Sequence, residues 1–335
     1  MKRLARHPLF WPLGALALLL ALNAAFNPGF LALGWRDGHL YGHLVDILSR
    51  AAPLMVVSLG MTLVIAVRGL DISVGAVVAI AATVAALLIG GAFNAGGEAA
   101  SEHPLWLAVG AALLVAAGCG LWNGLLVVKA GMQPIVATLV LMVAGRGIAQ
   151  LLTGGQIITV YYPPFFTIGG GFLAGLPVAL WIAAALWGGL HFALSRTALG
   201  LFIRAIGGNP EAARVAGVRS GAITLCVYTF CGLAAGIAGL IVSSNVRSAD
   251  ANNAGQLLEL DAILAVTLGG TALTGGRFTL AGTVIGALII QTLTSTIYSI
   301  GLPPEVNLVV KAVLVFAVML LQSADFRALF MAAQR

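Results

Sequence analysis

Long apolar runs, separated by short polar or glycine-containing turns, make up most of the chain. We count ten of them, at 10–29, 51–68, 72–92, 105–128, 134–152, 172–194, 222–242, 262–273, 280–299 and 306–322. A helix needs about 20 apolar residues to cross a bilayer, and these continuous runs lack the alternation of outer-membrane strands. The pattern predicts an all-α transmembrane bundle of about ten spans, in a single domain of residues 1–335. The eighth run is short and ends in glycines, so a half-span or a re-entrant segment fits it as well.

Composition and charge agree with a membrane-spanning bundle. Hydrophobic residues make up 60% of the chain and charged residues 8%, whereas a soluble domain has about 25% charged residues. The ten-span topology puts twelve cations in cytoplasmic segments and three in outer loops, as expected because Lys and Arg concentrate on the cytoplasmic side. Both termini are therefore predicted to be cytoplasmic. The cations are scattered at span ends, which favours this explanation of the net charge of +6 over nucleic-acid binding.

The most charged loop, 195–221, also contains the signals of a short helix at 209–216. In chain order they are Asn209 at the N-cap, Pro210 at the first helical position, Glu211 in the first turn, Arg214 toward the end and Gly217 at a left-handed stop. A helix of about two turns is not stable alone in water. The segment is either a solvated connector or a docking element. The caps at both ends and a Gly207-Gly208 hinge before the helix favour docking.

Several motifs, in chain order, resemble those of the ribose-type permeases of ABC sugar importers. They are GLDISVG at 69–75, QPIVATL at 133–139 with Arg146-Gly147, AIGGN at 205–209 with EAAR at 211–214 and Gly217, ELDAI at 259–263, and the glycine-rich block 269–277. The segment RSADANNAG at 247–255 is most similar to galactofuranose-type members of the family. One departure is Phe278, where the family usually has glycine.

The resemblance implies a mechanism and a set of partners. Two permease subunits would form the pathway, a periplasmic sugar-binding protein would deliver the sugar, and a separate ABC ATPase would bind ATP and Mg²⁺. This chain has no GxxxxGK[ST] phosphate loop of its own, so no cofactor is expected in it. A heterodimer with a second permease is favoured over a homodimer. The resemblance assigns ATPase coupling to Gly207, Gly208, Asn209, Glu211, Ala212, Arg214 and Gly217.

Polar side chains within or beside the apolar runs are candidates for a sugar pathway. They are Asn123, Gln133, Thr138, Arg146, Gln150, Gln291 and Asn307. Each of them can equally serve as a hydrogen bond between helices. For the two cations inside spans, Arg146 and Lys311, the structural alternative is a carbonyl or a charged partner such as Asp261. In the outer loop, four residues either contact the delivery protein or are solvated: Asp250, Asn252, Asn253 and Glu259.

Four further patterns are expected to serve the fold. Glycine pairs at GxxxG spacing, 120/124, 232/236 and 282/286, predict close helix packing. The stretches 64–80 and 266–285 share an apolar run, a charged glycine turn and a small-residue helix, both turns facing the cytoplasm. Arg68 and Asp71 are expected to form an ion pair that fixes their turn, with gating or ATPase contact as the alternative. His39, His43 and Asp46 have helical spacing for zinc, but neighbouring glycines weaken such a helix, and we predict no metal site.

These observations predict a non-enzymatic permease subunit of a sugar importer, multi-pass in the bacterial inner membrane and surrounded by lipid. An ion-gradient-driven secondary transporter also suits ten spans, but it requires a carboxylate inside the membrane, and each acidic residue falls at a span end or in a loop. A membrane enzyme requires clustered His, Asp or Cys near one face, for which the chain offers only the trio at 39, 43 and 46.

Overall fold

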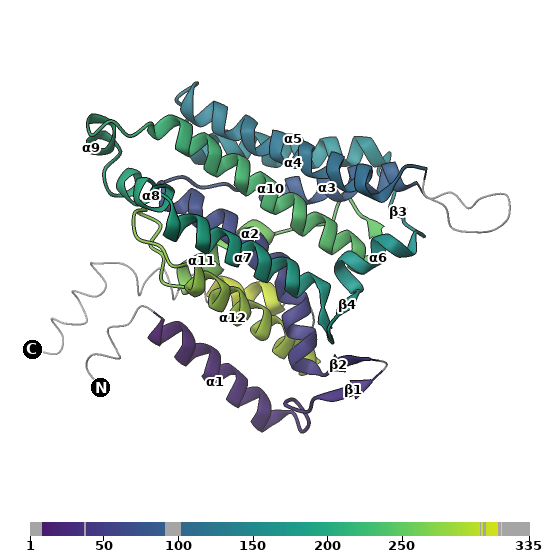
Figure 1. Ribbon diagram of the computed structural model, residues 1–335. Coiled ribbons are helices and arrows are strands. Elements are labelled where there is room, and N and C mark those ends of the chain that lie inside the picture. The colour runs from purple at the N-terminus through teal and green to yellow at the C-terminus, as the bar shows by residue number, and fades with distance from the viewer. Residues whose placement is uncertain are drawn as a thin grey trace, which may run out of the picture.

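The computed structural model describes residues 9–36, 38–90, 102–301, 303, 306–313 and 316, and this part of the chain is mostly helical (Figure 1). The helices are α1 (Phe10–Phe26), α2 (His43–Ala66), α3 (Val74–Ile89), α4 (Leu105–Val128), α5 (Pro134–Thr153), α6 (Pro163–Gly170), α7 (Val178–Arg196), α8 (Leu199–Gly208), α9 (Pro210–Val215), α10 (Ser220–Val246), α11 (Leu258–Leu268) and α12 (Leu280–Ser299). Residues 306–313 are also helical. Both chain ends and 317–322 of the tenth run lie outside the described residues, so the predicted location of the termini stays a prediction.

Short antiparallel strand pairs complete the described fold. They are β1 (Gly34–Arg36) with β2 (His39–Tyr41), β3 (Ile158–Thr159) with β6 (Ser248–Ala249), and β4 (Phe172–Leu173) with β5 (Leu176–Pro177). The register places Gly34 opposite Tyr41 and Ile158 opposite Ala249. Strands β1 to β4 lie at the end of the bundle opposite α9 (Figure 1). We call these two ends the strand end and the α9 end.

Six of the described helices are long and apolar enough to cross a membrane, namely α2, α4, α5, α7, α10 and α12. The apolar helices α1 and α3 are shorter, with 17 and 16 residues. Each of the ten predicted runs thus contains described helical residues, while ten full crossings remain a prediction. One run was wrong at its start, because 172–177 forms the β4–β5 hairpin and helix α7 begins only at Val178.

Helix α11, in the eighth run, is too short to cross a bilayer. Its 11 residues rise about 16 Å at 1.5 Å per residue, roughly half of the hydrocarbon thickness. After Leu268 the chain runs through a non-helical turn, 269–279, before α12 begins. This length fits the half-span that the sequence left open. It also brings the 269–279 turn into the α9 end of the bundle, against Ala66 at the end of α2.

Helix α2 is the centre of the described bundle. Every residue from 51 to 66 is buried, and the helix packs against α7, α8, α10, α11 and α12. A helix that is apolar on all sides lies either in a protein core or in lipid, and here neighbouring helices surround α2. Helix α10 is the second centre, since it contacts α2, α3, α4 and α6.

The three GxxxG pairs form helix–helix contacts, as predicted. Gly120 on α4 faces α10 so closely that a Cβ there would lie 2.3 Å from the Tyr228 carbonyl oxygen. On the other helix, a Cβ at Gly232 would lie 2.4 Å from the Ala116 carbonyl oxygen. Gly282 and Gly286 of α12 meet the backbone of Gly269 and of α11 in the same way. Because lipid supplies no hydrophobic drive between helices, such close backbone packing is a main source of association.

We expect Gly120→Ala to destabilise the protein, because the new methyl group overlaps the Tyr228 carbonyl and overpacking costs about 1–3 kcal/mol. Gly118→Ala, one half-turn away on the same helix, has no atom within 4 Å of its Cβ and serves as the matched control. Thermal unfolding in detergent should show a lower midpoint for Gly120→Ala alone. Equal midpoints for the two variants would contradict close packing of α4 on α10.

Candidate functional site

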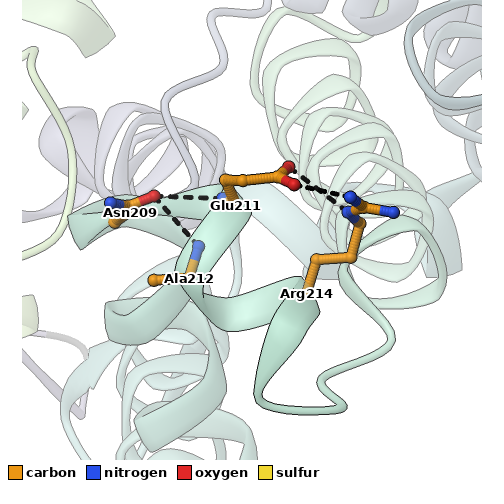
Figure 2. A network of polar contacts seen from close by, with 4 residues as sticks. All are labelled: Asn209, Glu211, Ala212 and Arg214. Atoms are coloured by element: carbon orange, nitrogen blue, oxygen red, sulfur yellow. Dashed lines mark hydrogen bonds and ion pairs between the residues drawn. The ribbon is translucent and has the colours of Figure 1, made fainter.

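The predicted loop helix is present, as α9 at one tip of the bundle (Figure 1). The Asn209 side-chain oxygen accepts hydrogen bonds from the N–H groups of Glu211 and Ala212, both at 3.1 Å. Glu211 forms an ion pair with Arg214 one turn later (Figure 2). Gly217 has a φ of +82°, the left-handed conformation expected after a helix end. The cap therefore forms as the sequence predicted.

The ion pair of α9 is strongly exposed, with 68% of the Arg214 side chain and 70% of the Glu211 side chain accessible. A pair so exposed contributes little to folding. Val215 beside it is also exposed, whereas Ala213 is buried against the rest of the bundle. Helix α9 thus presents charged groups and one apolar side chain outward on a rigid, capped turn.

The expected Gly207-Gly208 hinge is wrong, because both glycines belong to helix α8, which precedes α9. Gly207 lies where three parts of the chain meet at the α9 end. A Cβ on it would lie 1.9 Å from the Ala66 carbonyl oxygen and 2.3 Å from the Gly276 nitrogen. The Gly276 N–H in turn donates to the Ala66 carbonyl at 2.9 Å. We call this contact of Ala66, Gly207 and Gly276 the three-way junction.

Arg68 stabilises the three-way junction through hydrogen bonds to the end of α8. Its Nε donates to the Gly207 carbonyl at 2.7 Å and its guanidinium Nη2 to the Gly208 carbonyl at 2.6 Å. Its backbone has a φ of 64°, a left-handed conformation that costs a residue with a Cβ about 1–2 kcal/mol. The predicted ion pair with Asp71 is absent, since the arginine satisfies the two carbonyls at the end of α8 instead.

A cation–π contact also joins α8 to the 269–279 turn. The Arg204 guanidinium carbon lies 5.4 Å from the centroid of the Phe278 ring, and Phe278 is 8% exposed. The phenylalanine that replaces the family's usual glycine therefore packs against α8. Sequence reasoning missed α8 and these two arginine contacts. The apolar positions of LGLFIRAI at 199–206 were the available signal for the helix.

Asp71, the other expected partner of Arg68, belongs to a buried polar network inside the bundle. Its Oδ1 accepts from the Ser73 N–H at 3.0 Å and from the Ser73 hydroxyl at 2.7 Å. Asn123 donates its amide to the Ser73 hydroxyl at 2.8 Å, and Thr138 accepts from the Ile72 N–H at 3.3 Å. Two predicted pathway residues, Asn123 and Thr138, thus hold the 69–73 turn in this structure.

The two intramembrane cations have the structural partners that the sequence anticipated. Arg146 on α5 donates to the carbonyls of Ala251 at 3.0 Å and Ala254 at 2.6 Å. Lys311 pairs with Asp261 at 2.6 Å. Gln150, one turn after Arg146, donates to the Asn252 side chain at 2.6 Å. Arg146 and Gln150 therefore anchor the segment after β6, and Gln133 is exposed at the start of α5.

The four residues proposed to contact a delivery protein divide into two groups. Asn252 and Asn253 are exposed beside Asp250. A hydrogen bond from the Asn253 side chain, with two from backbone N–H groups, lowers the pKa of the Asp250 carboxyl. Glu259 is different, since it is 7% exposed and its carboxylate lies against Gly75 of α3. Glu259 is thus not accessible to a delivery protein in this conformation.

The histidine pair near the strand end does not share one helix. His39 lies in β2 and stacks on Phe172 at 4.0 Å, while His43 starts α2 and stacks on Phe30 at 6.1 Å. The one-face arrangement considered for zinc therefore does not form, because Gly42 ends the strand segment between them. Among the described residues there is no group of three His, Cys, Asp or Glu that could hold a metal.

Comparisons with known proteins agree with the motifs. A protein family described as the permease component of branched-chain amino acid transport systems matches residues 43–319. The galactofuranose transporter permease protein YtfT of Escherichia coli (strain K12) is 49% identical over 325 residues, which are 94% of this chain and 91% of that protein. No solved structure matches the chain.

Two further relatives match over similar lengths. The fructose import permease protein FruF of Bifidobacterium longum (strain NCC 2705) is 36% identical over 96% of this chain and 90% of its own. The ribose import permease protein RbsC of Escherichia coli (strain K12) is 34% identical over 92% of each. The chain is therefore a multi-pass membrane transporter permease rather than an enzyme, and it belongs to the family of branched-chain amino acid transport system permease components, in which these sugar permeases are its relatives.

Proposed function

We propose that this chain is the membrane-spanning permease subunit of an ATP-driven importer, which moves a monosaccharide from a periplasmic binding protein into the cytoplasm. Galactofuranose or a related sugar is the substrate class, in line with the relative at 49% identity. The chain works in the bacterial inner membrane with a second permease, preferably a different one. ATP and Mg²⁺ are bound by a separate ATPase subunit.

The observation that carries this proposal is α9 itself, a capped helix of six residues held out at the tip of an apolar bundle. A helix that short is stable only when its surroundings fix it. Its own ion pair is exposed, and its base is fixed by the three-way junction. The side chains that a partner could contact are therefore exposed, and the stability of the fold does not depend on them. A separate ATPase would dock there and transmit its closure as a rigid-body movement.

At the strand end, the exposed Asn252 and Asn253, with the partly exposed Asp250 beside them, are the proposed contact for the sugar-binding protein. The hydrogen bonds that lower the pKa of Asp250 keep its carboxylate charged well into the acidic range. This surface and α9 lie at opposite ends of the bundle, as delivery on one side and energy input on the other require. An ion-gradient carrier needs neither surface, so dependence of uptake on ATPase separates the two functions.

The docking role is tested by Glu211→Arg, which reverses the charge on an exposed position and leaves the cap of Asn209 in place. We expect sugar uptake and copurification of the ATPase to fall at least several-fold, while thermal stability stays the same. The double variant Glu211→Arg with Arg214→Glu restores the ion pair with its charges exchanged. The double variant should remain defective, because a docked partner contacts the side chains at 211 and 214 individually. Full recovery in the double variant, or intact uptake in Glu211→Arg, would count against docking.

The transmission role is tested by Gly207→Ala, whose methyl group has no room against Ala66 and Gly276. The matched control is Gly208→Ala, which has no atom within 4 Å of its Cβ. We expect Gly207→Ala to keep the ATPase bound yet lose most of the coupling between ATP hydrolysis and uptake, and Gly208→Ala to behave as wild type. Measured transport per ATP hydrolysed in proteoliposomes decides this. An unchanged ratio for Gly207→Ala would refute transmission through the junction.

A further inference from the structure

Three cavities meet at one side chain, Gln291 on α12. The largest, about 780 Å³, lies among α11, α12 and the helical residues 306–313. A second, of about 480 Å³, lies between α1, the start of α2 and the end of α12. A third, of about 490 Å³, lies between α2 and the end of α10. Gln291 lines all three, while Asp46 and Arg50 line both of the smaller ones.

The residues shared by the three cavities show where the cavities lie in the bundle. Asp46 and Arg50 belong to the first turns of α2, which begins directly after β2 at the strand end (Figure 1). The largest cavity has Asp261, from the first turn of α11, and Lys311 in its wall. Gln291 thus lies between the polar groups of α2 at the strand end and the largest cavity, which we call the chamber. The chamber is open on one side, since Leu260, Tyr298 and Leu308 in its wall are half-exposed.

The chamber contains a hydrogen-bonding atom that the fold itself does not use. Asn307 lines it and is 5% exposed, yet its side-chain oxygen has no hydrogen-bond partner. A buried polar atom without a partner is costly. Five described side chains have such an atom, and of these five only Asn307 lines the chamber. Across the same chamber, Asp261 and Lys311 form an ion pair at 2.6 Å with side chains 19% and 15% exposed. Their remaining oxygen and hydrogen atoms are available to a ligand.

The other residues of the chamber wall suit contact with one face of a sugar ring. Leu257, just before α11, and Leu260 and Leu264 on α11 supply apolar contact, and Tyr298 from α12 supplies an aromatic side chain with a hydroxyl. Small-molecule sites are commonly about 300–1,000 Å³, mostly apolar, with a few placed polar groups. A monosaccharide has this mixed character, since its hydroxyls point outward from a ring with C–H faces.

We propose that this chamber is a sugar subsite on the translocation route, with Gln291 at the entrance and Asn307 and the Asp261–Lys311 pair as its polar contacts. This rests on the proposed import of a monosaccharide. Of the seven polar residues that the sequence offered as pathway candidates, the route uses Gln291 and Asn307. The other five line none of the three cavities.

The first test is uptake by the complete transporter, carrying Gln291→Leu or Asn307→Leu. The probes are radiolabelled ribose, fructose and galactose, and galactose in water includes galactofuranose at equilibrium. We expect uptake of the transported probe to fall about tenfold or more, because a site that hydrogen-bonds a hydroxyl loses affinity when its partner is removed. Copurification of the ATPase should not change. The control is Thr229→Val on α10, whose hydroxyl bonds within its own helix and lines none of these cavities. It should keep wild-type uptake.

The second test does not depend on the Leu variants folding. Thr294→Cys, in the chamber wall, is made in a background with Cys119, Cys226 and Cys231 replaced. A charged, membrane-impermeant thiol reagent added to spheroplasts should label it, and the transported sugar should slow labelling several-fold. Thr283→Cys on the same helix, fully buried against Thr62, is the unlabelled reference.

The outcomes separate the two proposals. If the wild-type transporter shows no ATP-dependent uptake of any of the three sugars, the proposed function fails and the subsite fails with it. If wild-type uptake is present but Gln291→Leu and Asn307→Leu match Thr229→Val, the subsite alone is wrong. Labelling of Thr294→Cys that equals the Thr283→Cys reference, or that sugar does not slow, likewise overturns the subsite and leaves the importer intact.

Discussion

The described structure depends on backbone-to-backbone contact between helices, and the three-way junction is one of the places where that contact is tightest. Within a membrane, each backbone polar group must find its partner inside the protein. At the α9 end, the Gly276 N–H and the Arg68 guanidinium satisfy the carbonyls at the ends of α2 and α8. Gly207 permits this approach, because any side chain there would overlap Ala66. Three segments far apart in sequence are thereby fixed as one body.

Much of this arrangement could be predicted from the sequence where the signal is local. The cap at Asn209, the stop at Gly217 and the GxxxG contacts of α4 with α10 depend on residues within one or two turns, or on size alone. The carbonyl partners of Arg146 and the pairing of Lys311 with Asp261 followed from the cost of an unpaired charge in an apolar run.

The remainder depends on contacts between distant segments, which spacing does not encode. Two glycines in a row at 207 and 208 read as a hinge, yet α8 continues through them because α2 and the 269–279 turn pack against them. Arg68 has an acidic neighbour three residues away, but the carbonyls at the end of α8 lie closer to its guanidinium. In the sequence, Gln291, Asn307 and Asn123 are all polar residues within or beside apolar runs. Only the packing of the surrounding helices shows that Asn123 bonds to Ser73, while Gln291 and Asn307 line the chamber.

The 269–279 turn also connects the α9 end of the bundle to the chamber. The turn 269–279 joins α11 to α12, and these two helices, with residues 306–313, form the chamber wall. That turn is hydrogen-bonded to Ala66 through Gly276 and stacked against Arg204 of α8 through Phe278. Because Gly207 has no free space, a displacement of α8 toward these segments would press directly on Ala66 of α2 and on Gly276 of the turn. Helix α11 is only 11 residues long, and its backbone packs closely against α12 at Gly286, so the turn and these two helices form one packed unit beside the chamber.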